Sequence, residues 1–311
     1  MKTIKVILTA CVSVFVIGNA NAQQEAMVSQ YMFNGLFLNP AYAGSQECLT
    51  TTMLFRKQWV GFDGSPYTFI AAADMPLVEN KMGVGLVLAN DNIGVSNQTD
   101  IVGNYSYNIK LGEDSKLAFG LKAGMSIYSA KVSDLTTWDE SDPMFESDIR
   151  NQVIPKFGFG VYYHQKEKWY AGISIPTLLA YEKGMGFSLN MNKTSFMRRH
   201  LLITGGYVFQ AGESVKLKPS ILMKYTAAAP FEADINFSAL FKDMIWVGLS
   251  FRTGDALVTL LEYQASSSFR IGYAYDITVS KMRNFSAGSH EIMVGYDFGK
   301  ADVKEKSPRY F

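Results

Sequence analysis

The sequence carries little charge, no basic excess and only one cysteine beyond its first residues. Charged residues make up 18% of the 311 residues, below the ~25% usual for soluble domains. The formal net charge is only +1. Nucleic-acid-binding proteins are expected to carry a basic patch or excess, so we predict no nucleic-acid partner. Because Cys11 lies in the N-terminal leader, Cys48 is left without a partner for an internal disulfide.

The N-terminus has the pattern of an export signal. A basic start precedes an apolar core over residues 6–17 and a small-residue cleavage site at 20–22. We therefore predict a cleaved signal peptide over residues 1–22, with the mature chain beginning at Gln23. No later stretch has the ~18 consecutive apolar residues of a transmembrane helix. An exported chain without such a helix is either soluble outside the cytoplasm or a β-barrel, because only helices and closed barrels satisfy their backbone hydrogen bonds in lipid.

What the sequence does have is aromatic residues, at 14%, and strand-like alternation. Around the short polar turn 165–167, apolar and aromatic side chains alternate with small or polar ones, which is typical of a β-hairpin. Similar units recur along the chain. An even number of strands, with lengths near the ~9–11 residues of a tilted spanning strand, favours a bacterial outer-membrane barrel. The predicted strands are 50–59, 66–74, 82–90, 98–109, 116–128, 155–164, 168–176, 196–209, 214–227, 230–241, 244–252, 255–264, 267–277 and 289–299.

The connections between these strands are short on one side and long on the other. Short connections follow even-numbered strands, as at 165–167 and 242–243, whereas the long ones at 129–154, 177–195 and 278–288 follow odd-numbered strands. This asymmetry is typical of outer-membrane barrels. It predicts periplasmic termini, long loops that face outward, and a location in the outer membrane of a Gram-negative bacterium.

The polar side of the alternation carries charges that must avoid lipid. An unpaired Arg or Lys that faces lipid at the midplane costs ~2–4 kcal/mol, so the charged faces are predicted to point into the lumen. The mixture of signs favours internal ion pairs or contacts with a plug over the single-sign ring of an ion filter. The candidate lumen charges are Lys122, Lys216, Lys218, Glu232, Asp234, Arg252, Arg270 and Asp276.

Residues 23–49 precede the strands and are rich in Phe, Tyr and Leu, with several turn signals. Disordered leaders are rarely so aromatic, so we predict a plug or latch. The fold class is all-β: a single antiparallel transmembrane β-barrel of about 14 strands with this N-terminal segment. The layout is a signal peptide (1–22), a periplasmic or lumen segment (23–49), the barrel (50–299) and a periplasmic tail (300–311).

Two details fit the alternation poorly. Lys57 falls on the outer face of strand 50–59, and strand 255–264 alternates weakly. Pro219, inside strand 214–227, cannot donate a ladder hydrogen bond and predicts a bulge.

No catalytic or metal-binding motif is found. The three histidines, His164, His200 and His290, lack metal-ligand spacing and cysteine neighbours. The acidic loop 134–148 lacks an EF-hand pattern, and we interpret it as solvated. Ser289 and His290 cannot act as nucleophile and base, because adjacent side chains of a strand point to opposite faces. We therefore predict no enzyme activity, no metal and no cofactor.

Three groups of residues resemble the PorP/SprF family. They are Gln30-Tyr31-Met32-Phe33-Asn34 with Asn39-Pro40-Ala41-Tyr42-Ala43-Gly44, then Arg56-Lys57-Gln58-Trp59 with Gly64-Ser65-Pro66, and Gly288-Ser289-His290-Glu291. Gly295-Tyr296 and the C-terminal Ser307-Pro308-Arg309 are also similar to the family. The resemblance covers the mature chain, from about residue 23 to 311. It provides a candidate plug or partner-contact motif: Tyr31, Phe33, Asn34, Asn39, Pro40, Tyr42, Gly44, Arg56, Gln58, Trp59, Gly64 and Pro66.

The resemblance implies an outer-membrane barrel that is accessory to the type IX secretion system. Its implied partners are outer-membrane lipid, the periplasmic ring lipoproteins of that system, and secreted cargo with a C-terminal sorting domain, in some members a gliding-type adhesin. The alternative is a porin-like solute channel. A barrel enzyme acting on lipid or peptide and a soluble exported β-sandwich lectin are further rivals.

Overall fold

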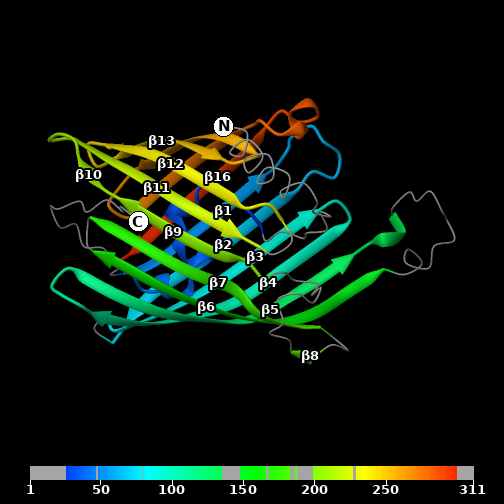
Figure 1. Ribbon diagram of the computed structural model, residues 1–311, viewed down its shortest axis with the longest axis horizontal. Coiled ribbons are helices and arrows are strands. Elements are labelled where there is room, and N and C mark those ends of the chain that lie inside the picture. Colours follow the sequence, from blue (N-terminus) through cyan, green and yellow to red (C-terminus); the bar gives the residue numbers. More distant parts are fainter. Residues whose placement is uncertain are drawn as a thin grey trace, which may run out of the picture.

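The computed structural model is a single antiparallel sheet that closes on itself (Figure 1). It describes residues 26–46, 48–78, 80–134, 148–165, 168–182, 186–187, 199–226 and 229–299. The strands are β1 (Leu49–Lys57), β2 (Tyr67–Leu77), β3 (Met82–Ile93), β4 (Ser96–Lys110), β5 (Ser115–Ala130), β6 (Ile149–Gln165), β7 (Trp169–Glu182), β8 (Gly186–Phe187), β9 (Leu201–Tyr207), β10 (Phe209–Gln210), β11 (Val215–Tyr225), β12 (Glu232–Phe241), β13 (Ile245–Arg252), β14 (Ala256–Gln264), β15 (Phe269–Thr278) and β16 (Ser289–Phe298).

Fourteen of these strands form the ring. Neighbours in sequence pair along β1 to β7 and along β11 to β16. Between these runs β7 pairs with β9 and β9 with β11, and β16 closes the ring on β1. The two-residue β8 pairs only with the end of β7, and β10 continues the line of β9 along β11. Each of the fourteen predicted strands corresponds to one ring strand, so the predicted closed barrel is confirmed.

The two ends of the barrel differ. At one end the connections are tight turns, such as 111–114 and 242–244, and we call it the short-turn end. The other carries longer connections, such as 58–66 between β1 and β2 and 279–288 between β15 and β16, and we call it the long-loop end. In Figure 1 this end lies to the right, where β5 and β6 project beyond their neighbours.

The wall of the barrel is apolar outside and polar inside. In β13, Val247, Leu249 and Phe251 are exposed, whereas Ser250 and Arg252, which alternate with them, are buried. The same alternation recurs around the ring, with exposed aromatic and aliphatic side chains on the outer face. An apolar outer face suits lipid, and a polar interior suits the inward charges predicted from the sequence.

The short helices do not contribute to the wall. They are η1 (Tyr31–Phe33), α2 (Gly35–Leu38), η2 (Pro40–Tyr42), η3 (Val132–Asp134) and η5 (Lys281–Asn284). Among the residues described, no helix is both long and apolar enough to cross a membrane.

The predicted bulge at Pro219 is wrong. The pairing of β11 with β12 runs without a register shift, and the β9 and β10 pairings on its other side share one offset. Pro219 lies opposite the break between β9 and β10, so the N–H group that it lacks is not needed in the ladder on that side of β11. The register shifts instead in two other places. One is between β5 and β6, near Tyr128, and the other is between β6 and β7, where Gly158 packs against Pro176 in the irregular stretch.

Several predictions concern residues outside the described part of the chain. These are the signal peptide over 1–22 and most of the acidic loop 134–148. The tail over 300–311 also lies outside it.

Candidate functional site

Residues 26–46 lie inside the barrel, and we call them the inner segment. It consists of η1, α2 and η2 joined by tight turns, and most of its side chains are buried. Asn39 ends α2 and begins η2, where its side chain accepts a hydrogen bond from the Ala41 amide at 2.9 Å. Pro40 occupies the first position of η2, where its lack of an N–H costs nothing. The Asn-Pro pair therefore sets the bend predicted from the sequence.

The inner segment runs from the long-loop end to the short-turn end. Ala26 lines a pocket with Thr226 and Pro230, beyond the long-loop ends of β11 and β12. Gly44, with φ +67°, packs against the short-turn ends of β2 and β3 and donates its amide to Asp74 at 2.9 Å. The chain then turns back into β1.

An arginine cluster fixes the start of the inner segment. Glu291 accepts the backbone amides of Ser29 and Gln30, each at 2.7 Å. Arg56 is the register partner of Glu291 and lies 3.2 Å from its carboxylate and 2.7 Å from that of Asp276. These side chains are almost completely buried, so the two carboxylates and the arginine hold the segment without competing water.

Arg252 extends this cluster to the opposite side of Ser29. It contacts Asp276 at 3.0 Å and Asp234 at 3.2 Å, and it donates to the Ser29 hydroxyl at 3.0 Å. Arg56 also donates to that hydroxyl, at 2.8 Å. One serine of the inner segment therefore connects two arginines on β1 and β13.

A buried lysine lies against the middle of the inner segment. Lys218 is 1% exposed, and within the described residues its Nζ has no hydrogen-bond partner. Three ring centres surround the ammonium group: Tyr170 at 5.6 Å, Trp246 at 5.6 Å and Phe33 at 5.9 Å. Glu262 is the opposite charge that acts on it. Phe33 belongs to the inner segment, so this cation–π cage joins the segment to the wall.

The second half of the inner segment contacts the wall at glycines. A Cβ atom on these glycines would collide with the segment, which shows how closely the two backbones approach. The distances from such a Cβ would be 2.0 Å at Gly83 (to Ala43 O), 2.1 Å at Gly120 (to Ala41 N) and 2.0 Å at Gly160 (to Asn39 Oδ1).

Four further hydrogen bonds complete this half, three of them between neutral groups and one from the Lys122 ammonium. Side chains of the wall reach backbone carbonyl groups of the segment, and Asn39 reaches a carbonyl group of the wall. The bonds are Ser106 Oγ to Ala43 O at 2.6 Å, Ser174 Oγ to Leu38 O at 2.7 Å, Lys122 Nζ to Phe37 O at 3.3 Å and Asn39 Nδ2 to Val161 O at 3.0 Å. They come from β4 to β7, opposite the strands of the arginine cluster.

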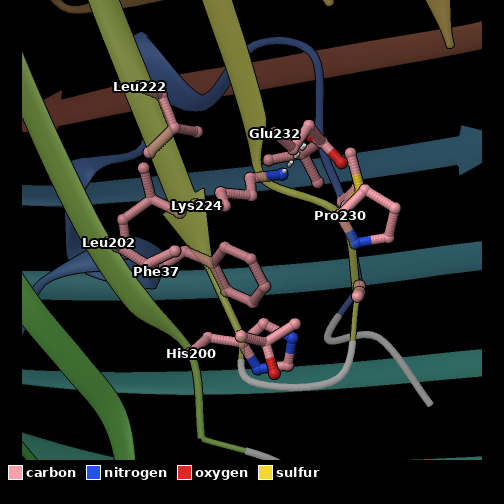
Figure 2. Close-up of a pocket in the computed structure, with 13 residues that line it drawn as sticks. Phe37, His200, Leu202, Leu222, Lys224, Pro230 and Glu232 are labelled. Carbon is pink, nitrogen blue, oxygen red and sulfur yellow. Dashed lines mark ion pairs between the residues drawn. The ribbon is translucent and has the colours of Figure 1, made fainter. Parts of the chain in front are cut away.

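A pocket that is partly open to solvent remains beside the start of the inner segment. Figure 2 shows Lys224 and Glu232 on one side, 3.3 Å apart, and the ring of Phe37 between that pair and His200 in this view. Leu202 and Leu222 supply apolar wall. This pocket lies beside the start of the inner segment, toward the long-loop end.

The structure places seven of the eight candidate lumen charges in the described interior network. Lys122 and Lys218 contact the inner segment, Arg252, Asp234 and Asp276 form the arginine cluster, and Glu232 pairs with Lys224. The seventh, Arg270 on β15, lies 3.3 Å from the carboxylate of Asp297 and 3.0 Å from the hydroxyl of Thr52. Lys216 differs: it pairs at 3.0 Å with the partly exposed Asp243 at the short-turn end.

The residues of the candidate motif divide between two places. Tyr31, Phe33, Asn34, Asn39, Pro40, Tyr42 and Gly44 belong to the inner segment, and Arg56 meets its start. Gln58, Trp59, Gly64 and Pro66 lie in the 58–66 connection at the long-loop end. There the Trp59 amide donates to Ser289 Oγ at 3.1 Å, so the three groups of residues that resemble the family meet at Arg56, Ser289 and Glu291.

The set of candidates omitted several residues that the structure brings into the interior. Glu291, Asp297 and Lys224 are buried or half-buried, and all lie on the polar faces of their strands. Alternation alone could have identified them. It could not show that Glu291 binds two amides of a segment about 260 residues earlier in the chain.

The arrangement can hold a segment and offers little for chemistry. Within the described residues, no group of three or more His, Cys, Asp or Glu side chains converges as a metal site. His290 bonds through Nδ1 with Tyr273 OH at 2.7 Å on the outer face, while Ser289 is buried. The nucleophile and base that the sequence brings together are therefore on different faces.

Comparison with known proteins identifies a family and a set of barrels. The family described as "Type IX secretion system membrane protein PorP/SprF" matches residues 20–296. No curated protein matches the sequence. Among solved structures, the chain is similar to the Acinetobacter baumannii outer membrane protein Omp33, with 9% identity, 82% of this chain and 100% of that chain covered, and a TM-score of 0.47. It is also similar to a Pseudomonas aeruginosa FadL homologue, with 10% identity, 86% of this chain and 94% of that chain covered, and a TM-score of 0.46. A third similar structure is the CymD monoaromatic hydrocarbon channel, with 11% identity, 88% of this chain and 93% of that chain covered, and a TM-score of 0.49.

Proposed function

This chain belongs to the PorP/SprF family of type IX secretion system membrane proteins, and we propose that it is an accessory outer-membrane component of that system. In this role it supports the secretion or surface attachment of proteins with a C-terminal sorting domain, among them a gliding-type adhesin. It acts through protein contacts and without enzymatic chemistry.

The observation that supports this function is the packing of the inner segment. Its hydrogen bonds, ion pairs and ring contacts reach strands on all sides of the lumen, from Asp74 on β2 to Glu291 on β16. We propose that the segment acts as a plug. A barrel whose interior is occupied over its short-turn half does not suit the passage of solutes, which requires an open path.

Partners of this plugged barrel would bind its two ends. The short-turn end, in the predicted orientation, faces the periplasm and the ring lipoproteins of the secretion system. The long-loop end faces the cell surface and carries the longer connections, which are the part of a barrel best suited to contact cargo. The inner segment contributes to both ends, through Gly44 at one and Ala26 at the other.

The experiment that tests the function is quantitative proteomics of the culture medium and the cell surface after deletion of the gene. We expect a selective loss of one or a few proteins with C-terminal sorting domains, restored by the wild-type gene. An unchanged surface proteome, in a strain without a second copy of the family, would contradict the proposal.

Single-channel recording separates the plug from the solute channel. Purified protein in a planar bilayer is expected to show no steady conductance. A stable open level for the wild-type protein would instead favour the porin-like alternative. Because conductance and secretion are measured independently, failure of the plug does not by itself reject the secretion role.

A further inference from the structure

Four outward-facing side chains at the long-loop end form a continuous row across β15, β16, β1 and β2. Tyr275 is the register partner of His290, His290 of Lys57, and Lys57 of Tyr67. Directly opposed side chains of antiparallel strands lie about 5 Å apart. The row therefore places a cation and a histidine between two tyrosines on the outer face of the barrel, where the sequence had marked Lys57 as a misfit.

The polar groups of this row are held in place. The Lys57 ammonium donates to Ser65 O at 2.8 Å and lies 5.7 Å from the centre of the Tyr67 ring. Because Ser65 belongs to the connection beyond β1, the ammonium is directed toward the long-loop end, as expected of a lysine that reaches from an apolar face to the interface. His290 is held by its 2.7 Å bond with Tyr273 OH.

The row marks the edge of the apolar band. One outward step toward the middle of the barrel, the positions on β1, β2 and β16 are Phe55, Phe69 and Ile292, all exposed. On these three strands only the connections 58–66 and 279–288 lie beyond the row, whereas β15 continues for three residues past Tyr275 and exposes Ile277 there. Aromatic residues with a polar group are typical of this boundary between acyl chains and headgroups.

These two connections add exposed cations and an aromatic ring above the row. Backbone hydrogen bonds of 2.7 and 2.8 Å join 58–66 to 279–288, so the loops form one unit. Lys281 and Arg283 on η5 are exposed, and Phe285 beside them is 65% exposed. We call this unit, together with the row, the rim patch.

The rim patch has an excess of positive charge. Its three cations are Lys57, Lys281 and Arg283, and its carboxylate is Asp63 in the 58–66 connection. In the described part of the chain, none of the three cations forms an ion pair. In the arginine cluster, by contrast, each arginine has two or more carboxylates.

We propose that the rim patch binds the phosphate groups of a lipid headgroup in the leaflet at the long-loop end. With that end outward, the lipid is the bisphosphorylated glucosamine lipid of the outer leaflet, lipid A. Lys57, Lys281 and Arg283 neutralise its phosphates, and Phe285 and the tyrosines pack against its sugar and upper acyl chains. The position of the patch on the lipid-facing wall selects a lipid over a soluble anion.

The test compares two triple variants of the full-length protein in detergent. The first carries K57Q, K281Q and R283Q. The matched control carries K110Q, K168Q and K242Q, which remove three exposed lysines at the short-turn end. Native mass spectrometry measures retention of lipid A and of the same lipid after removal of both phosphates. Heat-dependent gel mobility confirms that each variant is folded.

The wild type and the control are expected to retain lipid A and to discriminate against the dephosphorylated lipid. The rim variant is expected to bind lipid A on the order of a hundredfold more weakly, because it loses three cations and each contributes about 1 kcal/mol near an anionic surface. Should the triple variant fail to fold, R283Q alone changes only an exposed loop and is expected to weaken binding about fivefold. Equal binding by the rim variant and the control, equal binding of both lipids, or displacement of lipid A by millimolar inorganic phosphate would overturn the proposal.

Discussion

The two halves of the inner segment are held by different chemistry. Its start is bound by buried charges, where Glu291 accepts two backbone amides and two arginines share the Ser29 hydroxyl. Its end lies in backbone contact with glycines of the opposite wall and makes serine hydrogen bonds there, and its charged contacts are single ones, from Lys122 to Phe37 O and from the Gly44 amide to Asp74. The first half therefore depends mainly on which groups are charged, and the second mainly on which positions of the wall lack a side chain.

This difference decides which changes each half tolerates. A buried ion pair that loses one partner leaves an uncompensated charge, so even a substitution that adds no volume is costly. A glycine contact has no charge to lose and fails when volume is added. Four substitutions test this comparison.

The largest effect is expected for Glu291→Ala. It removes the acceptor of two amides and a counter-charge of Arg56, and breaking such a buried pair costs about 3–5 kcal/mol. The midpoint of denaturant unfolding in detergent should fall, and limited proteolysis should release the first half of the inner segment. Glu213→Ala, in an exposed short turn, is the control. A Glu291→Ala protein as stable as the control would show that the charges do not hold the segment.

Gly120→Ala is expected to have the next largest effect. Its Cβ would lie 2.1 Å from the Ala41 amide nitrogen, so the segment or the wall must shift, at about 1–3 kcal/mol. Gly103→Ala on β4 is the matched control, because the nearest atom to its Cβ is 3.7 Å away and the residue faces outward. The same unfolding measurement applies. Equal midpoints for the two alanine variants would contradict the close backbone contact.

Lys218→Met tests the middle of the segment, where the two kinds of contact meet. It removes a buried cation without a described hydrogen-bond partner and keeps an unbranched side chain among the three rings. Replacing buried charges by apolar groups of similar volume is often neutral or stabilising, so we expect no loss of stability and a gain of up to about 1 kcal/mol. A clear loss would mean that the cation–π cage holds the segment as firmly as the arginine cluster does.

The smallest effect is expected for Lys216→Gln. Its ion pair with Asp243 is partly exposed at the short-turn end, and such pairs are worth about 0–1 kcal/mol. The unfolding midpoint should be nearly unchanged, and raising the salt concentration should remove what difference remains. A loss as large as that of Glu291→Ala would place Lys216 with the interior charges after all.

The wall of the barrel was predictable because the residue alternation within each strand shows which side faces outward and which faces the lumen. A period of two residues is a local property, and it identified all fourteen strands and the inward direction of Arg252, Arg270 and Asp276. The bulge was misplaced for the same reason. A proline inside a strand is visible locally, but Pro219 keeps its register, and the register shifts lie near Tyr128 and where Pro176 meets Gly158.

The interior contacts were less predictable because they depend on distance across the barrel. The aromatic N-terminal segment suggested a plug, yet nothing local shows which strand faces Ser29. Glu291 and Arg56 become neighbours only when β16 closes on β1, the longest step in sequence that the ring makes. Lys216 and Lys218 share one face of β11 and differ only in their position along the barrel axis. Lys216 forms an ion pair at the short-turn end, whereas Lys218 lies among aromatic rings in the interior.

The direction of the inner segment sets an order of assembly. The segment descends from the long-loop end to the short-turn end, β1 climbs back beside it, and β16 must then join β1. Because glycines of the wall lie in close contact with the inner segment, a segment with three short helices and large aromatic side chains does not fit through a ring that has already closed. We therefore expect the strands to close around the inner segment, with the β16–β1 seam forming last and placing Glu291 on the amides of Ser29 and Gln30.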